Sequence, residues 1–455
     1  NGFLSIDSYE STTLLILEKL LKLSKTTNKG QKESNLRYLS QCNINFEDPL
    51  KKVALQKLFV NSQVMLIYGA AGTGKTTLIN HISNMMNQSK KLFLTKTYTA
   101  LQNLKRLIDN PGLDSDFVSI DSFTKTITLT DYDIVFVDEC STIDNRTMKR
   151  LLEKIDESTQ LILAGDIYQI ESIDFGNWFY YAKDIIKTDY ANVELLNTWR
   201  TDKKELKSLW DEVRCIEPII TEKLAIDGPF SSKIGEEIFI PQDEDEIVLC
   251  LNYDGKFGLN NMNLYFQNAN TKSDVYTWTE WTFKVGDPVI FLDTKRSSLL
   301  YNNLKGKIVD ISKNDSAISF TLDIDTILTE RQCRNESFEF VDITDFGTRI
   351  RLEVIANNDE TATDEERIKT IIPFQIAYAI SIHKAQGLEY KSVKIIIPPY
   401  NAEKISHSIF YTAITRAKEK LKIYWSAETM KSVVESFSKE KVGQHTLELI
   451  EKKLE

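Results

Sequence analysis

Cysteine, histidine and long apolar runs are scarce in this chain of 455 residues. Its five cysteines and four histidines are dispersed without a CxxC pair, which argues against a disulfide framework or a structural zinc site and is typical of a reducing cytoplasm. No run approaches the ~20 consecutive apolar residues of a membrane helix. The start lacks a basic segment followed by an apolar one, so we expect no signal peptide. It also lacks Met, as in a processed chain or part of a longer polypeptide. These absences predict a cytoplasmic protein without membrane contact.

Acidic residues outnumber basic ones, and the formal net charge is −10. This balance argues against a tight, static DNA-binding protein, whose affinity comes largely from phosphate contacts. It does not exclude a motor, because a local basic groove is enough and processive movement needs contacts that can be released.

Alternating short apolar strands and helical stretches dominate from Pro49 onward, which predicts a parallel sheet covered on both faces. The expected strands of the first series are Val64–Tyr68, Lys91–Leu94, Ile134–Val137 and Leu161–Leu163. A second series starts near Asn192, includes Glu246–Asn252, resumes at Ile372 and continues with Val393–Ile397 and Leu421–Trp425. Between its two parts, about Trp278 to Leu352, β-branched and aromatic runs separated by Gly, Asn and Asp predict a small inserted β-domain with strands in Val285–Leu292, Gly306–Ile311 and Ala317–Asp323.

The two ends of the chain show helical patterns. Leu14–Leu23 has apolar residues at helical spacing, and Ser24–Asn35 has the composition of a flexible linker. The role of the first 45 residues stays open between the remnant of a lost domain and a docking helix. The tail from Ala427 is charged and helical in spacing. Protein partners are expected through the N-terminal segment or the C-terminal helix.

A phosphate-binding loop is the first chemical motif. Gly69–Thr76 matches GxxxxGK[ST] between an apolar strand and a helical stretch, which is the context that this motif requires. Backbone N–H groups of such a loop and the following helix N-terminus bind phosphates. Lys75 is expected at the β- and γ-phosphates, and Thr76 as a ligand of Mg²⁺. The predicted nucleotide-binding residues here are Gly69, Ala70, Ala71, Gly72, Thr73, Gly74, Lys75, Thr76 and Thr77.

Two acidic residues follow the strand Ile134–Val137. Asp138 suits a Mg²⁺ site, and Glu139 suits the base that polarises an attacking water. An acidic pair after a strand is also common at helix starts, so this prediction gains its weight from the phosphate-binding loop upstream.

Four further segments resemble motifs of the superfamily 1 helicases, in particular the RecD-like and Dda-like branch. Gly165–Gln169 is similar to GDxxQ, and the resemblance makes Gln169 a sensor of the γ-phosphate. Leu195–Arg200 and Tyr411–Lys418 resemble two segments whose arginines, here Arg200 and Arg416, reach the γ-phosphate. Ala379–Glu389 resembles the motif T-x-H-K-x-Q-G-x-E, with Ser at the Thr position. By that resemblance Ser381, His383 and Lys384 lie near the nucleic-acid backbone, and Gln386, Gly387 and Glu389 near the nucleotide.

A further candidate for nucleic-acid contact follows the strand Lys91–Leu94. In Thr95–Ala100, Lys96 and the hydroxyls of Thr97 and Thr99 suit sequence-independent phosphate contacts, and Tyr98 can stack on a base. Ordinary loop and helix-cap chemistry is the alternative for this segment. Ser119–Phe123 resembles a segment that usually reads T-I-H-S, and Asp121 stands in place of the His. That exchange removes a potential phosphate donor.

The resemblance implies an α/β fold of two RecA-like P-loop domains with a small SH3-like β-domain inserted in the second. The inserted domain is implied by Phe283–Ile290 and Asn302–Ile308, and in relatives it goes with 5′→3′ movement on single-stranded DNA. The expected organisation is an N-terminal helix and linker (1–45), a first RecA-like domain (46–190), a second RecA-like domain in two parts (191–275 and 356–455, ending in a helix), and the insertion (276–355).

Two departures from the family pattern qualify this interpretation. Relatives commonly carry an adenine-reading Gln before the loop, whereas this chain has Leu50 near that position, and Gln56 lies closer to Gly69 than expected. NTP hydrolysis is therefore better supported than a preference for ATP. Only Thr124–Asp133 is available for the pin-like insertion that splits a duplex in relatives, which favours translocation over strand separation.

The sequence thus predicts a helicase or translocase that uses ATP and Mg²⁺ on single-stranded DNA, with RNA as a second possible track. One alternative is a P-loop ATPase subunit of a larger complex, for example in defence or repair, that signals or remodels without processive unwinding. Another is a non-catalytic scaffold that binds nucleic acid. The Ser381–Glu389 motif argues against the first. The second is disfavoured by the intact residues Lys75, Glu139, Arg200 and Arg416.

Overall fold

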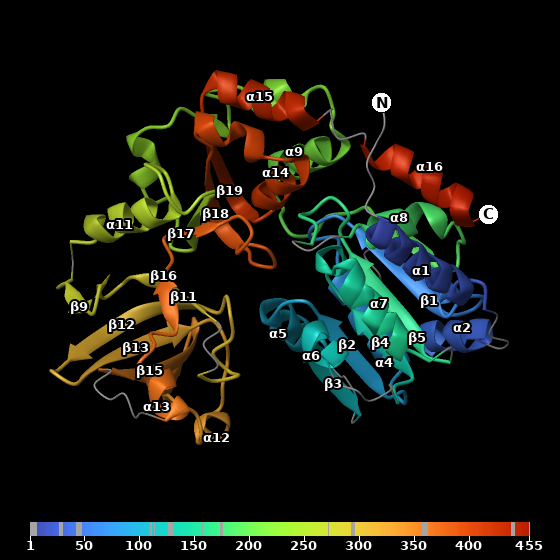
Figure 1. Ribbon diagram of the computed structural model, residues 1–455, viewed down its shortest axis with the longest axis horizontal. Helices are drawn as coiled ribbons and strands as arrows, with labels where there is room; N and C mark the ends of the chain where they lie inside the picture. Colours follow the sequence, from blue (N-terminus) through green and yellow to red (C-terminus); the bar gives the residue numbers. More distant parts are fainter. Residues whose placement is uncertain are drawn as a thin grey trace. The chain divides into compact units, whose positions relative to one another are not determined.

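The chain divides into two compact units in the computed structural model (Figure 1). Residues 1–222, 403–419 and 431–455 form the first unit, and residues 223–402 and 420–430 form the second. The structure describes residues 7–26, 31–41, 48–109, 112, 114–125, 131–156, 158–172, 176–271, 273–292, 296–356, 363–437 and 442–454. Among these residues, no helix is both long and apolar enough to cross a membrane.

A six-stranded parallel sheet in the order β3-β2-β4-β5-β1-β6 is the centre of the first unit. Alternate side chains of each strand point to opposite faces, so β1 sends Leu66 into one apolar core and Ile67 into the other. Both faces are covered, which is why the strands read as continuous apolar runs. The strands are β1 (Val64–Gly69), β2 (Lys91–Thr95), β3 (Ser115–Ser119), β4 (Ile134–Val137), β5 (Gln160–Gly165) and β6 (Asn192–Leu195).

Helices cover the two faces of this sheet (Figure 1). The core on one face contains residues from α1 (Asp7–Leu23), α6 (Ile120–Lys125), α7 (Asn145–Lys154), α8 (Trp178–Ile185) and α16 (Val442–Leu454). The core on the other face contains residues from α3 (Pro49–Lys57), α4 (Lys75–Met85) and α5 (Tyr98–Leu107), with α2 (Gln31–Gln41) packed against it. The helices α9 (Lys204–Cys215) and α14 (His407–Ile414) pack on each other, and the indole of Trp210 donates to the Ile414 carbonyl at 3.1 Å.

The N-terminal helix is an integral part of the first unit. Leu17 and Leu20 of α1 are fully buried in the same core as Ile450 of α16. The ammonium of Lys453 on α16 also pairs with Glu10 on α1. The prediction of a flexible linker over Ser24–Asn35 is wrong for its last residues, because α2 begins at Gln31. The buried side-chain amide of Asn35 donates to the Leu58 carbonyl at 2.7 Å.

The strand at Asn192 corrects the expected domain boundary. The sequence pattern predicts that this strand opens the second α/β series, but β6 pairs in parallel with β1 and forms an edge of the first sheet. The pairing is long-range, with Leu66 opposite Asn192, and local apolar patterns do not encode it. Residues 403–419 and 431–455, expected in the second RecA-like domain, likewise belong to the first compact unit.

The second unit contains a five-stranded sheet in the order β17-β8-β18-β19-β7. β8 pairs in parallel with β17 and β18, and the helix α11 (Leu259–Ala269) is joined to β17 by the Asn263 amide. The strands are β7 (Ser231–Ser232), β8 (Glu246–Cys250), β17 (Ala379–Ser381), β18 (Tyr390–Ile396) and β19 (Ala417–Tyr424). Along the chain, α10 (Ile220–Lys223) precedes β7, η2 (Glu236–Phe239) precedes β8, η3 (Pro399–Lys404) follows β18, and α15 (Ala427–Phe437) follows β19.

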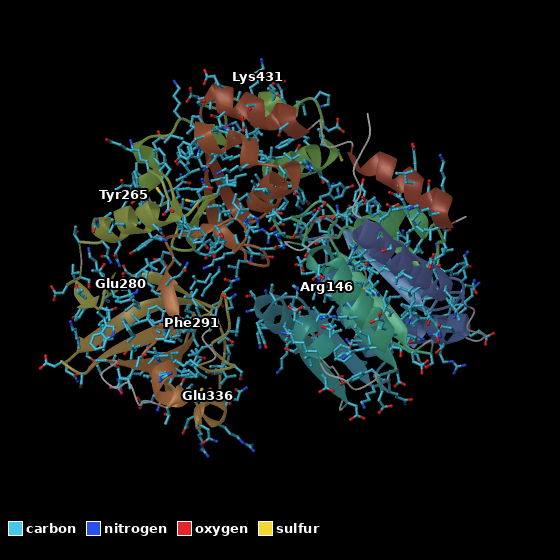
Figure 2. The ribbon with its side chains drawn as sticks, viewed as in Figure 1. Arg146, Tyr265, Glu280, Phe291, Glu336 and Lys431 are labelled. Carbon is cyan, nitrogen blue, oxygen red and sulfur yellow. The ribbon has the colours of Figure 1, made fainter. Side chains whose placement is uncertain are left out.

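A six-stranded antiparallel sheet, β14-β15-β13-β12-β11-β16, forms the inserted β-domain of this unit. Phe291, labelled in Figure 2, is fully buried in its core with Phe320 and Phe374. The insertion extends beyond the expected end at 355, because β16 pairs with β11 and places Ile376 opposite Val289. Its elements are the hairpin β9 (Tyr276–Trp278) and β10 (Trp281–Phe283), β11 (Pro288–Phe291), β12 (Lys305–Lys313), β13 (Ala317–Ile324), α12 (Glu330–Cys333), β14 (Glu339–Thr344), β15 (Gly347–Ile355), α13 (Asp364–Lys369) and β16 (Phe374–Ile376).

Candidate nucleotide site and nucleic-acid contacts

The phosphate-binding loop connects the carboxyl end of β1 to the N-terminus of α4. Gly72 and Gly74 have φ values of +76° and +83°, a region in which a Cβ is strained. A side chain at Gly72 would also collide with the Cβ of Arg200. The two glycines are therefore needed both for the turn and for the close approach of a neighbouring segment.

Lys75 lies folded over this loop. Its ammonium donates to the carbonyls of Gly69 at 2.9 Å and Ala70 at 3.1 Å. Lys75 is also the first residue of α4, so its positive charge lies close to the positive end of a helix dipole. This combination makes the loop a strong attractor of anions.

The acidic pair lies directly opposite the loop. The Thr76 hydroxyl donates to Asp138 Oδ2 at 3.1 Å, and the Glu139 amide donates to Asp138 Oδ1 at 2.9 Å. Burial, followed by the charge of Glu139, raises the pKa of Asp138 to about 6, although Lys75 opposes this rise. A buried carboxylate with a raised pKa favours a cation beside it. Thr76 and Asp138 offer the hard oxygen atoms that Mg²⁺ prefers, so the residues present fit that ion.

Glu139 has a left-handed backbone, with φ 57°, at the end of β4. Its Oε2 atom is buried and accepts no hydrogen bond from the described residues. Gln169 is similar: its side chain is 3% exposed, its Nε2 donates to Asp166 Oδ2 at 3.2 Å, and its Oε1 is buried without a partner among the described residues. A buried polar atom with no partner costs free energy, so both groups have capacity for a further polar ligand.

Arg200 contacts the loop from the segment after β6. The Trp199 amide donates to the Gly72 carbonyl at 2.8 Å and holds this segment against the loop. The Arg200 guanidinium then donates through Nη1 to the Thr415 carbonyl at 2.9 Å, after the end of α14. The structure therefore brings one predicted arginine together with the phosphate-binding loop.

Arg416 is oriented differently. It is 1% exposed, its Nε donates to the Thr412 carbonyl at 2.9 Å, and its Nη2 donates to the Thr415 hydroxyl at 3.2 Å. These bonds tie the guanidinium to its own helix end. The role of Arg416 at the nucleotide site therefore stays a prediction, whereas Arg200 lies in a segment that contacts the loop at Gly72.

Two residues of α14 that were not predicted as site residues join it to the nucleotide loops. The Tyr411 hydroxyl accepts from the Ala71 amide at 3.4 Å, and the Thr412 hydroxyl accepts from the Ile170 amide at 2.9 Å. Both residues lie within the Tyr411–Lys418 motif, so the motif could have identified them as site residues. A third unpredicted neighbour is Lys51 of α3, whose ammonium lies beside Gly74.

The candidate nucleic-acid residues of the first unit lie at the start of α5. The Thr97 hydroxyl caps the helix by accepting from the Ala100 amide at 3.2 Å, and Tyr98 is 42% exposed. Thr99 is only 5% exposed, so Thr97 and Tyr98 present the larger surface. The segment expected to lack a pin lies between α6 and β4 and is partly outside the described residues, at 126–130.

The motif Ala379–Glu389 lies in the second unit, after β17. The Ser381 hydroxyl accepts from the Lys384 amide at 3.2 Å, and the Lys384 ammonium donates to Gln375 Oε1 on β16 at 3.1 Å. His383 is exposed. Of the predicted nucleotide contacts, Gln386 and Gly387 form a tight turn with φ +77° at Gly387, and the Glu389 carbonyl accepts from Lys305 at 2.7 Å.

No cluster of three or more His, Cys, Asp or Glu side chains is placed to hold a metal ion in the described part of the chain.

Comparison with known families matches two segments of the chain. Residues 51–219 match an AAA domain, and residues 376–424 match the UvrD-like helicase C-terminal domain. The RecBCD enzyme subunit RecD of Buchnera aphidicola is 22% identical over 442 residues, which cover 83% of this chain and 73% of that protein. The RecD subunit of Haemophilus influenzae is also 22% identical, over 88% of this chain and 73% of its own length.

Solved structures agree with these matches. Bacteroides Pif1 bound to single-stranded DNA aligns with a TM-score of 0.52 at 16% identity, over 85% of this chain and 94% of that chain. A structure of two coordinating Pif1 helicases at forked duplex DNA aligns with a TM-score of 0.50 at 15% identity over the same shares. At this identity the likeness shows the fold, which is a mixed α/β fold with two RecA-like domains.

Proposed function

Because the chain belongs to the RecD-like and Pif1-like branch of superfamily 1 helicases, we propose that it couples ATP hydrolysis to movement along single-stranded DNA in the 5′→3′ direction. The observation that supports this proposal best is the convergence on one loop of Lys75, the Thr76–Asp138 pair and Arg200. A binding protein without catalysis has no need for this arrangement.

ATP is expected to bind with its phosphates in the Gly69–Thr76 loop. Lys75 would exchange its bonds to the Gly69 and Ala70 carbonyls for the β- and γ-phosphates. Thr76 and Asp138 would hold Mg²⁺, which neutralises phosphate charge as the transition state develops.

Hydrolysis is assigned to three side chains around this loop. Glu139 is the base that orients and deprotonates the attacking water, since its unpartnered Oε2 can accept the water's proton. Gln169 presents its unpartnered Oε1 or its amide to that water or to the γ-phosphate. Arg200 donates its planar fork to the γ-phosphate and stabilises the charge that builds up there.

The link to movement is proposed to pass through α14. Arg200 bonds to the Thr415 carbonyl, and Thr412 bonds to the Gln169 loop at Ile170. A change at the γ-phosphate would therefore reach α14 by two routes within the first unit. Arg416, just after this helix, is proposed as the second arginine that reaches the γ-phosphate.

The DNA track is proposed to use Thr97 and Tyr98 in the first unit and Ser381, His383 and Lys384 in the second. Tyr98 is 42% exposed and can stack on a base, while the threonine, serine and lysine groups suit phosphates. Such contacts are independent of base sequence, as a translocating motor requires.

An ATPase assay with and without single-stranded DNA, duplex DNA and RNA tests the function. We expect single-stranded DNA to stimulate hydrolysis, and Lys75→Ala to abolish it. Robust hydrolysis that neither single-stranded DNA nor RNA stimulates would favour an ATPase without a nucleic-acid track. Equal turnover by wild type and Lys75→Ala would show that this loop is not the catalytic site.

Direction is tested by displacement of streptavidin from biotinylated oligonucleotides. A 5′→3′ motor clears streptavidin from the 3′ end and leaves it on the 5′ end. Clearance from the 5′ end alone would reverse the proposed polarity. A forked duplex tested in parallel separates unwinding from translocation.

A further inference from the structure

Lys51 places a second ammonium group at the phosphate-binding loop. It lies on α3, one helical turn after the N-cap Asp48, and is 7% exposed. A Cβ built on Gly74 would be 2.5 Å from Lys51 Nζ, 3.2 Å from its Cε and 3.5 Å from the Thr77 hydroxyl. The Lys51 ammonium, the Gly74 backbone and the Thr77 side chain therefore meet at one point, at the N-terminus of α4.

This position is electrostatically unusual for a lysine. The N-terminus of α4 already carries a partial positive charge, and Lys75 adds a full one. Lys51 also lies close enough to His81, further along α4, to help lower the pKa of that imidazole, after the larger effect of burial. Positive charges gathered at a helix N-terminus favour the binding of an anion there.

The location of Lys51 differs from that of Lys75. Lys75 lies over the Gly69 and Ala70 carbonyls at the start of the loop, whereas Lys51 lies at Gly74 and Thr77, where the loop becomes a helix. The two ammonium groups therefore lie near opposite ends of the polyphosphate that the loop would bind. Since Lys75 is assigned to the β- and γ-phosphates, the remaining end is the α-phosphate.

The neighbouring position offers no group that reads a base. Leu50, immediately before Lys51, packs against the apolar core formed by α3, α4 and the sheet. Gln56 lies on the last turn of α3, where the Asn35 amide donates to its carbonyl at 3.3 Å. At position 50 an aliphatic side chain cannot donate to or accept from a purine ring.

We infer that Lys51 binds the α-phosphate of the nucleotide, and that this site therefore recognises nucleoside triphosphates by their phosphates, with little discrimination among bases. The inference rests on the proposed nucleotide-hydrolysing function of the Gly69–Thr76 loop. Lys51 is a binding residue here, and takes no part in the chemistry at the γ-phosphate.

Equilibrium binding of a fluorescent ADP tests the contact without requiring turnover. We expect Lys51→Met to weaken ADP binding about tenfold, the usual scale for loss of one charge-assisted phosphate contact. The loss should be equal for ADP and for a non-hydrolysable ATP analogue, because both carry the α-phosphate. Lys51→Arg should retain most of the affinity. Lys52→Met, an exposed lysine on the same helix, is the matched control and should bind like wild type.

Steady-state hydrolysis of ATP, GTP, CTP and UTP tests the base indifference. Wild type should use all four with KM values within about tenfold of each other, because the aliphatic side chain at position 50 cannot form a hydrogen bond that distinguishes one base from another. Lys51→Met should raise each KM by the same factor and leave kcat nearly unchanged. Leu50→Gln should favour ATP selectively.

Several outcomes would overturn the inference. Unchanged ADP binding by Lys51→Met would show that Lys51 does not contact the phosphates. A loss of affinity confined to the ATP analogue would show that Lys51 contacts the γ-phosphate and not the α-phosphate. A strong wild-type preference for ATP removes the base indifference. If Lys51→Met fails to fold by thermal melting, Lys51→Gln and Lys51→Arg decide the same question.

Failure of the proposed function has a different signature. A wild-type protein that binds ADP through Lys51 but hydrolyses no nucleotide would contradict the proposed enzyme and leave the binding inference intact. Hydrolysis stimulated by DNA in wild type and in Lys51→Met alike, with equal KM, would contradict the inference alone.

Discussion

Lys96 and Asp121 form an ion pair at 3.0 Å on the surface where the nucleic-acid contacts of the first unit are proposed. Asp121 is the residue that stands in place of the family's usual His, and Lys96 immediately precedes Thr97. A second carboxylate, Asp144, lies 3.4 Å from the same ammonium. The charge exchange at position 121 therefore removes a phosphate donor and also neutralises a neighbouring lysine.

Replacement of Asp121 should strengthen DNA binding. In Asp121→Asn the ammonium of Lys96 keeps only its pair with Asp144. We expect several-fold tighter binding to single-stranded DNA at low salt. The slope of log affinity against log salt concentration should steepen by up to about one. Fluorescence anisotropy over a salt series measures both. The control is Asp131→Asn, which breaks the Lys90–Asp131 pair, also 3.0 Å long, at the other end of β2. Equal effects of the two variants would indicate a non-specific gain in charge.

Removal of the proposed base should separate binding from chemistry. Glu139→Gln keeps the shape of the side chain but cannot accept the water's proton, so kcat should fall by about 100-fold or more. Affinity for ADP should stay within a few-fold of wild type. Glu153→Gln on α7 is a suitable control because its exposed carboxylate pairs only weakly with Lys149, at 3.9 Å. A normal kcat in Glu139→Gln would assign the base elsewhere.

Arg200 should act mainly on the transition state. Arg200→Ala removes the guanidinium beside the loop, and we expect kcat to fall by about three orders of magnitude, as for other arginines that contact a transferring phosphoryl group. Arg200→Lys should recover little, because an ammonium lacks the planar fork. Arg146→Ala, at an exposed residue of α7 labelled in Figure 2, is the control. A rise in KM with unchanged kcat would make Arg200 a ground-state binding residue.

Lys305 should connect the inserted β-domain to the Ala379–Glu389 motif. Its ammonium lies 3.7 Å from the centre of the Tyr390 ring and donates to the Glu389 carbonyl at 2.7 Å. Lys305→Met should lower the free energy of unfolding of the second unit by about 1–3 kcal/mol, the combined scale of a cation–π contact and a charged hydrogen bond. Chemical denaturation measures it, and Lys307→Met, exposed on the same strand, should change little. If the stability is unchanged, the contact contributes nothing to the unit.

The N-terminal helix should be required for the stability of the first unit. Leu20 of α1 is fully buried in the core that also contains residues of α7, α8 and α16. Leu20→Ala should lower the free energy of unfolding by about 2–5 kcal/mol. Leu15→Ala, at a residue of the same helix that is 49% exposed, should cost much less. Similar effects of the two substitutions in a denaturant titration would argue that α1 is not part of the core.

The sequence by itself predicted the nucleotide site, because the motifs that build such a site are local. A strand, a glycine turn and a helix N-terminus within Val64–Met85 are enough to build a phosphate loop, and Asp138–Glu139 follow directly on a buried strand. The helicase resemblance came from motifs that are likewise short and continuous. Strand positions were also predictable, since apolar runs such as Ile134–Val137 depend on burial of both faces of the sheet.

Only the tertiary structure decided which strands pair and which charges meet. β6 and β16 look like any other short strands in sequence, but hydrogen bonding to β1 and β11 assigns them to the first sheet and to the inserted domain. The neutralisation of Lys96 and the approach of Lys51 to Gly74 also join residues far enough apart that no local pattern records them. Pairing energies depend on distances in space, and spacing along the chain does not specify those distances.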